Sequence, residues 1–375
     1  MPSKVLVTTR NFPPFVGGME RLVHESTIAL HHNFQVKLVG PSGCENHVPE
    51  SIQAVGCAMD SLPRFLTSSF FQTVRLAKSW RPDVIFCGSG LTAPAGLAAA
   101  RICGARLVVY AHGLDLIISN TLYRRLFLPT IRAADRVIVN SRYTAGLAAK
   151  IGVENDKIRV INPGVTLVKP DYEQGIAFRQ KYDLGNSPLL LSVGRLTPRK
   201  GLAEFLRESM PNILRDIPDF KLVIVGGEPT KALHGGSSLA AINAAANLIA
   251  PGAVRLLGSV DDNDLAGAYN ASSGFVFPVL DLAGDVEGFG MAALEAAAYG
   301  VPSVAFANGG VVDAICNEQS GYLITPGDYD AFTEATTKIL NEDTEKLVAG
   351  ARAHATRLAW PLFGQALRSS VDELL

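Results

Sequence analysis

The sequence predicts an α/β fold of two doubly wound, Rossmann-like units. A length of 375 residues suits two domains of ordinary size, and an apolar content of 48% with 18% charged residues allows a large buried core. Short β-branched runs alternate with helical runs along the whole chain. Apolar runs of four to six residues separated by helices are typical of parallel strands buried on both faces. Ligands are then expected beyond the carboxyl ends of the strands.

Each half contains six runs that we expect to form strands. In the first half the expected strands are Lys4–Thr9, Gln35–Gly40, Val84–Cys87, Arg106–Tyr110, Arg136–Asn140 and Ile158–Ile161. In the second half they are Leu189–Val193, Lys221–Val225, Val254–Leu257, Gly274–Phe277, Ser303–Phe306 and Tyr322–Ile324.

The boundary between the halves is expected at residues 162–170, which contain two prolines and a glycine. Residues 361–375 have the pattern of an amphipathic helix. We therefore place one domain at residues 1–165 together with a C-terminal helix, 358–375, and the other at residues 166–357.

Several classes of protein are disfavoured by composition. The five cysteines are scattered without a C-x-x-C pair, which favours a reduced cytoplasmic protein and no metal site. The N-terminus lacks the pattern of a signal peptide. The most apolar stretch, residues 91–111, is interrupted by Arg101 and Arg106, so we expect a helix and a buried strand there and no membrane span.

The two halves differ in charge. Residues 1–165 carry 18 Lys/Arg and 10 Asp/Glu, a net charge of +8, whereas the remainder carries 16 and 25, a net charge of −9. A basic half joined to an acidic half indicates two different tasks, and the basic half suits an anionic partner.

A glycine-rich turn lies between two glutamates, Glu287 and Glu295, in the run D-V-E-G-F-G-M-A-A-L-E-A-A-A (285–298). The alanine-rich part predicts a helix that begins near Phe289. The free N–H groups and positive dipole end of that helix would face an anion, and the two glycines of the turn permit close backbone approach. Glu287, just before the helix, can accept hydrogen bonds from hydroxyls.

Two other loops follow predicted strands. Gly17 and Gly18 follow the first strand of the chain and precede a helix, where a phosphate can meet backbone N–H groups. Arg195 and Lys200 follow the first strand of the second half, and two cations there could neutralise a diphosphate. We expect Arg199, between them, to be exposed to solvent.

Seven motifs occur in a fixed order. They are F-P-P-F-V-G-G-M-E (12–20), H-G-L-D (112–115), A-D-R-V-I-V-N-S (134–141), V-G-R-L-T-P-R-K-G (193–201), I-V-G-G (224–227), the two-glutamate block and S-G-Y-L-I-T-P-G-D (320–328). Together they resemble the retaining glycosyltransferases of family 4, and the residues of the motifs are most similar to those of mannosyltransferases of the phosphatidylinositol-mannoside type. Thr166 and Asp313 depart from the family pattern, which often has aspartate and glutamate there.

The resemblance implies the GT-B fold, with two Rossmann-like domains facing a central cleft. The second domain would bind a nucleotide-diphosphate sugar, GDP-mannose before a UDP-sugar, and the first a lipid-linked or glycan acceptor of cell-envelope polysaccharide or glycolipid synthesis. Transfer of the hexose would retain the anomeric configuration, without metal, cofactor, protein nucleophile or nucleic-acid partner.

The resemblance also implies roles for individual residues. Glu287 would hold sugar hydroxyls, Glu295 the ribose, and His112 would lie against the donor sugar. The residues expected to act in catalysis are His112, Glu287, Arg195 and Lys200. The residues expected to bind the donor are Gly17, Gly18, Arg195, Lys200, Gly226, Glu287, Gly288, Phe289, Gly290, Met291 and Glu295.

Two motifs are expected to be unrelated to the site. The D-Y-D run at residues 328–330 has the D-x-D form that binds a metal in GT-A glycosyltransferases, but it follows Pro-Gly and precedes a helix, so N-capping explains it better. The G-S-G run at residues 88–90 lacks the third glycine of a dinucleotide fingerprint.

Three alternatives stay open. The chain could be a GT-B epimerase or hydrolase that needs no acceptor, or a non-catalytic protein that binds sugar nucleotides. The basic helical run at residues 64–81, and a second at 123–127, could pack against the sheet or could bind an anionic membrane. The protein would then lie either in the cytoplasm or at the inner face of the membrane.

Overall fold

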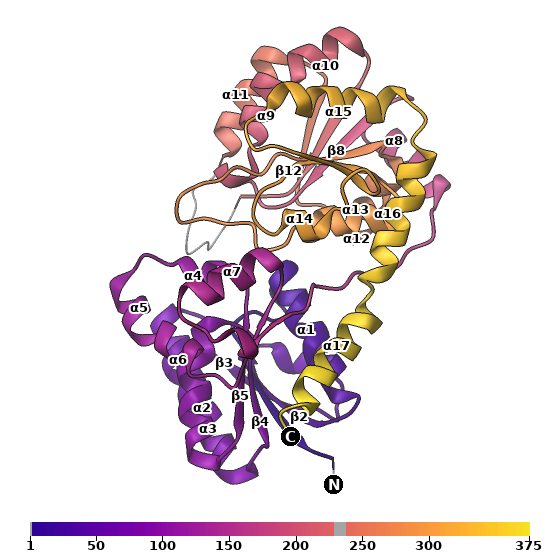
Figure 1. Cartoon of the computed structure of the whole chain (residues 1–375). Coiled ribbons are helices and arrows are strands. Elements are labelled where there is room, and N and C mark those ends of the chain that lie inside the picture. The colour runs from indigo at the N-terminus through magenta and orange to yellow at the C-terminus, as the bar shows by residue number, and fades with distance from the viewer. Residues whose placement is uncertain (1, 229–237) are drawn as a thin grey trace. The chain divides into compact units, whose positions relative to one another are not determined.

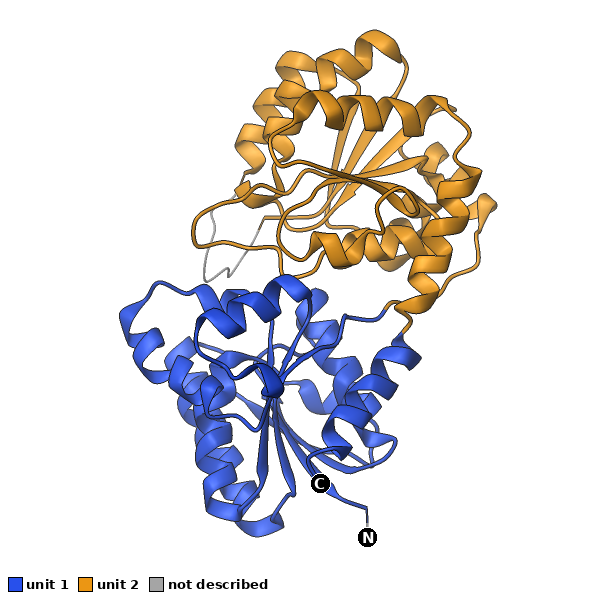
Figure 2. Ribbon diagram, in the orientation of Figure 1, with its two compact units in different colours: residues 1–164, 360–375 blue, residues 165–359 orange. Residues whose placement is uncertain are grey.

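The computed structural model describes residues 2–228 and 238–375. The chain forms two compact units, residues 1–164 with 360–375 and residues 165–359 (Figure 2). The C-terminal helix therefore belongs to the unit built by the first half of the chain. Each unit is described by itself.

The first unit contains a parallel sheet of seven strands in the order β3-β2-β1-β4-β5-β6-β7. Six of these strands match the predicted runs to within about a residue. The strands are β1 (Lys4–Thr8), β2 (Gln35–Pro41), β3 (Gln53–Cys57), β4 (Val84–Cys87), β5 (Arg106–Ala111), β6 (Arg136–Val139) and β7 (Ile158–Val160).

The strand β3 was not predicted. It pairs only with β2, at the edge of the sheet, and most of its residues are partly or fully exposed. An edge strand needs little apolar surface, so Q-A-V-G-C gives no buried run for a sequence pattern to detect.

Helices cover both faces of this sheet (Figure 1). The first helix, α1, and the C-terminal helix, α17, pack together, and both contribute to one core cluster with the strands. The helices are α1 (Gly18–His31), α2 (Leu62–Trp80), α3 (Ala93–Cys103), α4 (Leu114–Ile117), α5 (Thr121–Leu126), α6 (Leu128–Arg132), α7 (Arg142–Lys150) and α17 (Trp360–Asp372), with short 3-10 turns η1 (Cys44–His47), η2 (Gly90–Thr92) and η3 (Asn155–Lys157).

The second unit contains a parallel sheet of six strands in the order β10-β9-β8-β11-β12-β13. All six strands were predicted. They are β8 (Leu189–Val193), β9 (Lys221–Val225), β10 (Val254–Gly258), β11 (Gly274–Phe277), β12 (Ser303–Phe306) and β13 (Gly321–Ile324).

Alternate residues of these strands belong to two cores, one on each face of the sheet. Leu189 and Leu191 belong to one core with residues of α8, α12, α13 and α16, whereas Leu190 between them belongs to the other, with residues of α9, α10, α11 and α15. The helices are α8 (Tyr172–Lys181), α9 (Leu202–Glu208), α10 (Met210–Asp216), α11 (Leu239–Ile249), α12 (Asp262–Ala271), α13 (Met291–Tyr299), α14 (Val311–Ala314), α15 (Tyr329–Asn341) and α16 (Glu345–Arg357), with a 3-10 turn η4 (Pro198–Lys200).

Both sheets reverse their strand order once. The order runs outward from β1 to β3 on one side and from β4 to β7 on the other, and the second sheet reverses in the same way between β8 and β11. In open α/β sheets, the loops that leave the strands at such a point diverge and form a ligand site. The loops after β1 and β4, and after β8 and β11, are therefore the places to look for chemistry.

Within the described residues, no helix has both the length and the apolar character needed to cross a membrane.

Candidate active site

The reversal point of the second sheet brings two charged loops together. The loop after β8 carries Arg195, Arg199 and Lys200, and the loop after β11 carries Asp285 and Glu287. A backbone hydrogen bond from Leu280 N to Arg199 O, 2.8 Å long, joins the two loops. The cations and the carboxylates thus meet because of the sheet topology, although about 90 residues separate them in sequence.

Glu287 is held by two cations. Lys200 Nζ donates a hydrogen bond of 2.7 Å to Glu287 Oε2, and the Arg199 guanidinium donates to the same oxygen. The Lys200 ammonium also lies 4.3 Å from the centre of the Phe277 ring, a cation–π contact. The side chains of Glu287 and Lys200 are each 14% exposed, so the pair is largely withdrawn from water.

The cations decide the ionisation of Glu287. Burial by itself would raise the pKa of this carboxyl, but Lys200 and Arg199 outweigh it and lower the pKa to about 2. Glu287 is therefore a carboxylate throughout the physiological range, able to accept a hydrogen bond from a hydroxyl.

Arg199 contradicts its predicted exposure. Only 7% of its surface is exposed, and its Nε donates a hydrogen bond of 2.9 Å to Asp285 Oδ1. Burial alone would lower the pKa of this guanidinium, but Glu287 and Asp285 raise it. The prediction was wrong because two carboxylates that are distant in sequence compensate a charge that would otherwise stay in water.

Arg195, by contrast, is exposed. It lies two residues after the end of β8 and is near enough to Lys200 to affect its pKa. Burial, helped by the positive charges of Arg199 and Arg195, lowers the pKa of Lys200 in spite of Glu287. The site thus holds more positive charge than its carboxylates neutralise, as a site for an anion should.

The glycine turn before α13 is shaped by a second glycine pair. Gly310 N donates a hydrogen bond of 2.8 Å to Glu287 O, and a Cβ on Gly310 would overlap the carbonyl oxygen of Gly288. The two backbones can therefore lie against each other only because Gly310 has no side chain. This contact fixes the backbone that carries Glu287.

The helix α13 begins at Met291, two residues after the predicted start. Gly290 precedes it in a left-handed conformation, with φ 104°, and Phe289 is buried in the core of the unit. Any contact of Phe289 with a donor would therefore use its backbone. Ala293 N donates to Gly290 O at 3.0 Å, whereas the N–H groups of Met291 and Ala292, at the first two helical positions, precede any helical acceptor and are suited to an anion.

The remaining two predicted residues of this unit lie beside the charged loops. Gly226 follows β9, and a Cβ there would overlap the carbonyl oxygen of Gly194, so this glycine permits the loops after β8 and β9 to pack together. Glu295 lies in α13 and is partly buried; Tyr269 OH donates to its Oε2 at 3.3 Å. None of its hydrogen bonds in the described structure links it to Glu287.

The remaining predicted residues, Gly17, Gly18 and His112, lie in the first unit. Gly17 and Gly18 are exposed at the start of α1, directly after the loop that follows β1. This position at the carboxyl end of a strand is the one predicted for them.

His112 is 6% exposed and lies at the end of β5. Its Nε2 is 2.7 Å from the carbonyl oxygen of Gly88, and its ring stacks on Tyr110 with centroids 5.0 Å apart. Because a carbonyl can only accept, Nε2 carries a proton, and in the neutral ring Nδ1 is an acceptor. No described residue bonds to that buried Nδ1.

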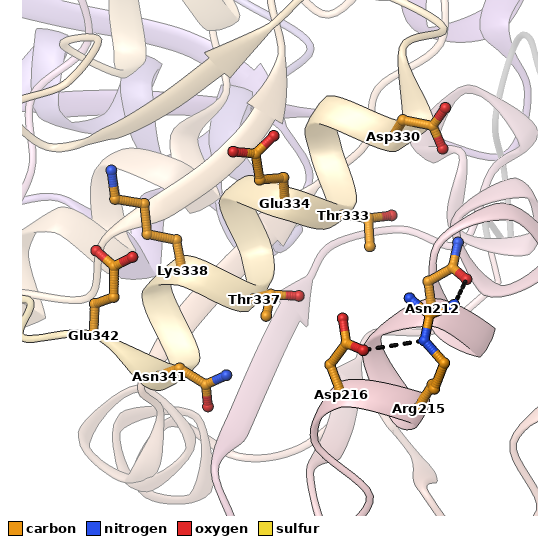
Figure 3. A pocket seen from close by; sticks show the side chains of 10 residues that line it. All are labelled: Asn212, Arg215, Asp216, Asp330, Thr333, Glu334, Thr337, Lys338, Asn341 and Glu342. Carbon is orange, nitrogen blue, oxygen red and sulfur yellow. Dashed lines mark hydrogen bonds and ion pairs between the residues drawn. The ribbon is translucent and has the colours of Figure 1, made fainter.

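The D-x-D motif behaves as predicted. Asp328 Oδ1 accepts a hydrogen bond of 2.9 Å from Ala331 N and caps α15. A polar groove of about 500 Å³ lies nearby, between α10 and α15, and Asp330 is among the residues that line it (Figure 3). None of the predicted site residues lines this groove.

Sequence reasoning missed Arg199 and Asp285. A signal for them was present, because Asp285 stands two residues before Glu287 and Arg199 directly before Lys200. Two cations and two carboxylates on loops that a doubly wound sheet brings to one reversal point are expected to pair.

The comparisons with known proteins agree with this architecture. Residues 16–169 match the family model of Glycosyltransferase Family 4, and residues 176–355 match that of Glycosyl transferases group 1. The D-inositol 3-phosphate glycosyltransferase of Acidothermus cellulolyticus is 31% identical over 326 residues, 80% of this chain and 70% of the relative. The GDP-mannose-dependent alpha-(1-6)-phosphatidylinositol monomannoside mannosyltransferase of Mycolicibacterium smegmatis is 27% identical over 366 residues, 92% of this chain and 91% of the relative.

Solved structures show the same fold. The Anabaena protein HepE, crystallised with UDP and glucose, has a TM-score of 0.80 at 18% identity, covering 99% of this chain and 100% of that one. Sucrose-phosphate synthase from Thermosynechococcus elongatus has a TM-score of 0.77 at 20% identity, covering 99% of both chains. The chain belongs to the group 1 glycosyltransferases of family 4 and is an enzyme with the GT-B fold.

Proposed function

We propose that this enzyme transfers a hexose from a nucleotide-diphosphate sugar to a lipid-linked or glycan acceptor with retention of the anomeric configuration. The observation that carries the proposal is Glu287, an ionised and largely buried carboxylate between two cations at the reversal point of the second sheet. A carboxylate held in this way suits sugar hydroxyls, and the adjoining cations and the N-terminus of α13 suit a diphosphate.

The chemistry would proceed without a protein nucleophile. The bond between the anomeric carbon and the diphosphate oxygen breaks, and the acceptor oxygen forms the new bond on the same face of the sugar. The proton of the acceptor hydroxyl passes to an oxygen of the departing diphosphate. Lys200, Arg195 and the N–H groups before α13 would stabilise the negative charge that grows on that leaving group.

GDP-mannose is the favoured donor and a UDP-sugar the second. The Mycolicibacterium relative, which matches along nearly its whole length, is GDP-mannose-dependent, whereas HepE was crystallised with UDP. The sequence likeness to the former is higher, 27% against 18%, so it receives more weight.

A screen of nucleotide sugars by thermal shift tests the donor. At a concentration 100 times its Kd a donor stabilises the folded state by ~2.7 kcal/mol, a rise in melting temperature of roughly 5–10 °C. We expect the largest rise with GDP-mannose. Nucleoside diphosphate should then be released only when an acceptor is added. Conversion of the donor alone would indicate the epimerase or hydrolase, and binding without any release would indicate a non-catalytic protein.

Chelation is expected to leave the activity unchanged. Arg195 and Lys200 on the loop after β8, together with a helix N-terminus, can supply the positive charge that a metal supplies in GT-A enzymes. The rate of nucleoside diphosphate release, measured before and after dialysis against EDTA, should agree within error. Full inactivation by EDTA that magnesium or manganese restores would contradict a metal-independent site.

The first unit offers a surface for an anionic membrane. Between residues 64 and 132 the chain has nine Lys/Arg and two Asp. The buried residues of α2 are Phe65, Ser69, Thr73 and Ala77, whereas Phe71 is 70% exposed. On α5, Leu122 and Leu126 are 66% and 53% exposed. Exposed apolar side chains among cations are typical of surfaces that bind anionic lipid.

Binding to anionic vesicles is therefore expected at low salt and should weaken as salt rises. Attraction of about 1 kcal/mol per basic residue suffices for reversible attachment. Replacing four exposed cations by glutamine should weaken vesicle co-sedimentation further without changing donor binding. The four cations are Arg75, Lys78, Arg124 and Arg125. The matched control replaces four exposed cations of the second unit: Lys169, Arg207, Arg215 and Lys346. A protein that ignores anionic vesicles at low salt would instead use its basic half for a soluble phosphorylated acceptor.

A further inference from the structure

Within the described structure, Arg199 differs from the other two cations of its loop in donating hydrogen bonds to two carboxylates, those of Asp285 and Glu287. Its Nε is bonded to Asp285 at 2.9 Å, its NH1 is bonded to Glu287, and its carbonyl accepts from Leu280 N. The side chain is 8% exposed, so it has almost no surface for a ligand. A donor molecule therefore has little access to Arg199, whereas Arg195 is exposed and Lys200 holds a single carboxylate.

Lys200 can exchange its partner more easily than Arg199, because Lys200 is bonded to one carboxylate and Arg199 to two. Both cations donate to Oε2 of Glu287, and Lys200 has no second carboxylate among its hydrogen bonds in the described structure. A diphosphate carries more negative charge than one carboxylate and would draw the flexible ammonium away from Glu287. A buried carboxylate that lost its last cation would tend to take up a proton, and it would then be a poorer acceptor for sugar hydroxyls.

We propose that Arg199 and Asp285 form a positioning pair: Arg199 is the permanent counterion of Glu287, so that Lys200 can move from Glu287 to the diphosphate of a bound donor. This role rests on the proposed function. Asp285 holds the Nε edge of the guanidinium and thereby directs NH1 at Glu287. Arg199 itself touches neither donor nor acceptor.

The charges around Glu287 support these separate roles of Arg199 and Lys200. The groups that act on it are Lys200 and Arg199, both from the loop after β8; Asp285, on its own loop, acts on Arg199, and Arg195 acts on Lys200. With Arg199 present, one cation remains on Glu287 whether or not Lys200 is engaged elsewhere. Without Arg199, donor binding and the ionisation of Glu287 would compete for the one remaining ammonium.

Three variants test the pair. Arg199→Met removes the charge at similar length, Arg199→Lys keeps the charge but not the fork that spans two carboxylates, and Asp285→Asn keeps Arg199 but weakens its orientation. The control is Arg215→Met, an arginine of the same unit whose side chain is 69% exposed. Affinity for GDP-mannose and UDP-glucose, kcat and KM are measured for each between pH 4.5 and 8.

The donor affinity of the wild type should change little between pH 4.5 and 8 on account of Glu287, because that carboxyl, with a pKa of about 2, stays ionised over the whole range. In Arg199→Met the pKa of Glu287 rises, so donor affinity should fall as the pH is lowered, and kcat at neutral pH should fall about ten- to a hundredfold. Arg199→Lys should recover part of both losses, and Asp285→Asn should show the same changes at smaller size. Arg215→Met should match the wild type.

The outcomes separate the two proposals. If the wild type binds no nucleotide-diphosphate sugar at any pH, the proposed function is wrong and the role of the pair is wrong with it. If the wild type binds one and Arg199→Met shows the same pH dependence and kcat, the pair alone is refuted. Should Arg199→Met fail to fold, which its melting curve will reveal, Asp285→Asn decides: an unchanged pH profile in that variant overturns the proposal.

Discussion

Lys200→Ala is expected to slow turnover roughly 30- to 1000-fold while the protein stays folded. The ammonium is the charge best placed to reach a departing diphosphate, since among the described residues it is held by Glu287 and by the face of Phe277. Loss of ~2–4 kcal/mol of stabilisation of the developing charge corresponds to that range of rates. The fold should persist because Glu287 keeps Arg199 as its counterion.

The measurement is nucleoside diphosphate release at saturating donor and acceptor, together with a melting curve. Lys346→Ala, which removes an exposed lysine from α16, is the matched control and should behave as the wild type. A Lys200→Ala enzyme that works at nearly the wild-type rate would remove this residue from the mechanism and leave Arg195 and the N-terminus of α13 to stabilise the leaving group.

Glu287→Gln is expected to lower both activity and stability. The amide keeps the shape of the side chain but removes the one anion shared by two buried cations. Turnover should fall roughly 30- to 1000-fold, because the interaction with sugar hydroxyls loses its charge. Breaking a buried ion pair costs about 3–5 kcal/mol, and the lower end applies because Asp285 still serves Arg199.

The pH dependence gives this prediction a second test. A carboxyl whose pKa is lower in the folded than in the unfolded state stabilises the fold above the ordinary carboxyl pKa, and that stability is lost as the pH falls through the folded value, here about 2. The deficit of Glu287→Gln in melting temperature should therefore be full at neutral pH and narrow below about pH 4. Glu345→Gln, at an exposed site on α16, is the control and should show no deficit. An unchanged melting temperature in Glu287→Gln would mean that the ion pairs do not hold the two loops together.

The two variants should thus differ in kind. Lys200→Ala loses rate and keeps stability, whereas Glu287→Gln loses both. The difference arises because one cation can be removed while another stays on the carboxylate, but the carboxylate has no substitute. A stability loss of equal size in both variants would argue against Arg199 as a sufficient counterion of Glu287.

Most of the architecture could be read from local patterns. Twelve strands were predicted, and each is present. Nine of them are largely buried, and a parallel strand buried on both faces must be apolar along its length. The alternation of Leu189, Leu190 and Leu191 between two cores illustrates the constraint. The edge strands β7, β10 and β13 are only partly buried but still contain apolar residues. The strand β3 was missed because Q-A-V-G-C contains no apolar run, and an exposed strand at the edge of the sheet does not need one.

Parts of the site could be read in the same way. Glu287, the glycine turn and Lys200 were predicted from residue types at the ends of strands and helices. Arg195 was predicted as a cation of the site, and it is exposed, whereas Arg199 was predicted to be exposed and is buried. Both belong to one loop with the same local composition, so nothing within that loop distinguishes them.

The sequence by itself determined the fold class, the order of strands and helices along the chain, and the kinds of side chain that follow each strand. Only the tertiary structure decided which charges pair. Hydrophobic periodicity is a local property and survives in the sequence, whereas the burial of Arg199 depends on Asp285 and Glu287, which lie 86 and 88 residues away and meet it only when β8 and β11 become neighbours. A charged side chain can be buried where an opposite charge is held beside it, and here the pairing of strands in the sheet brings the two charges together.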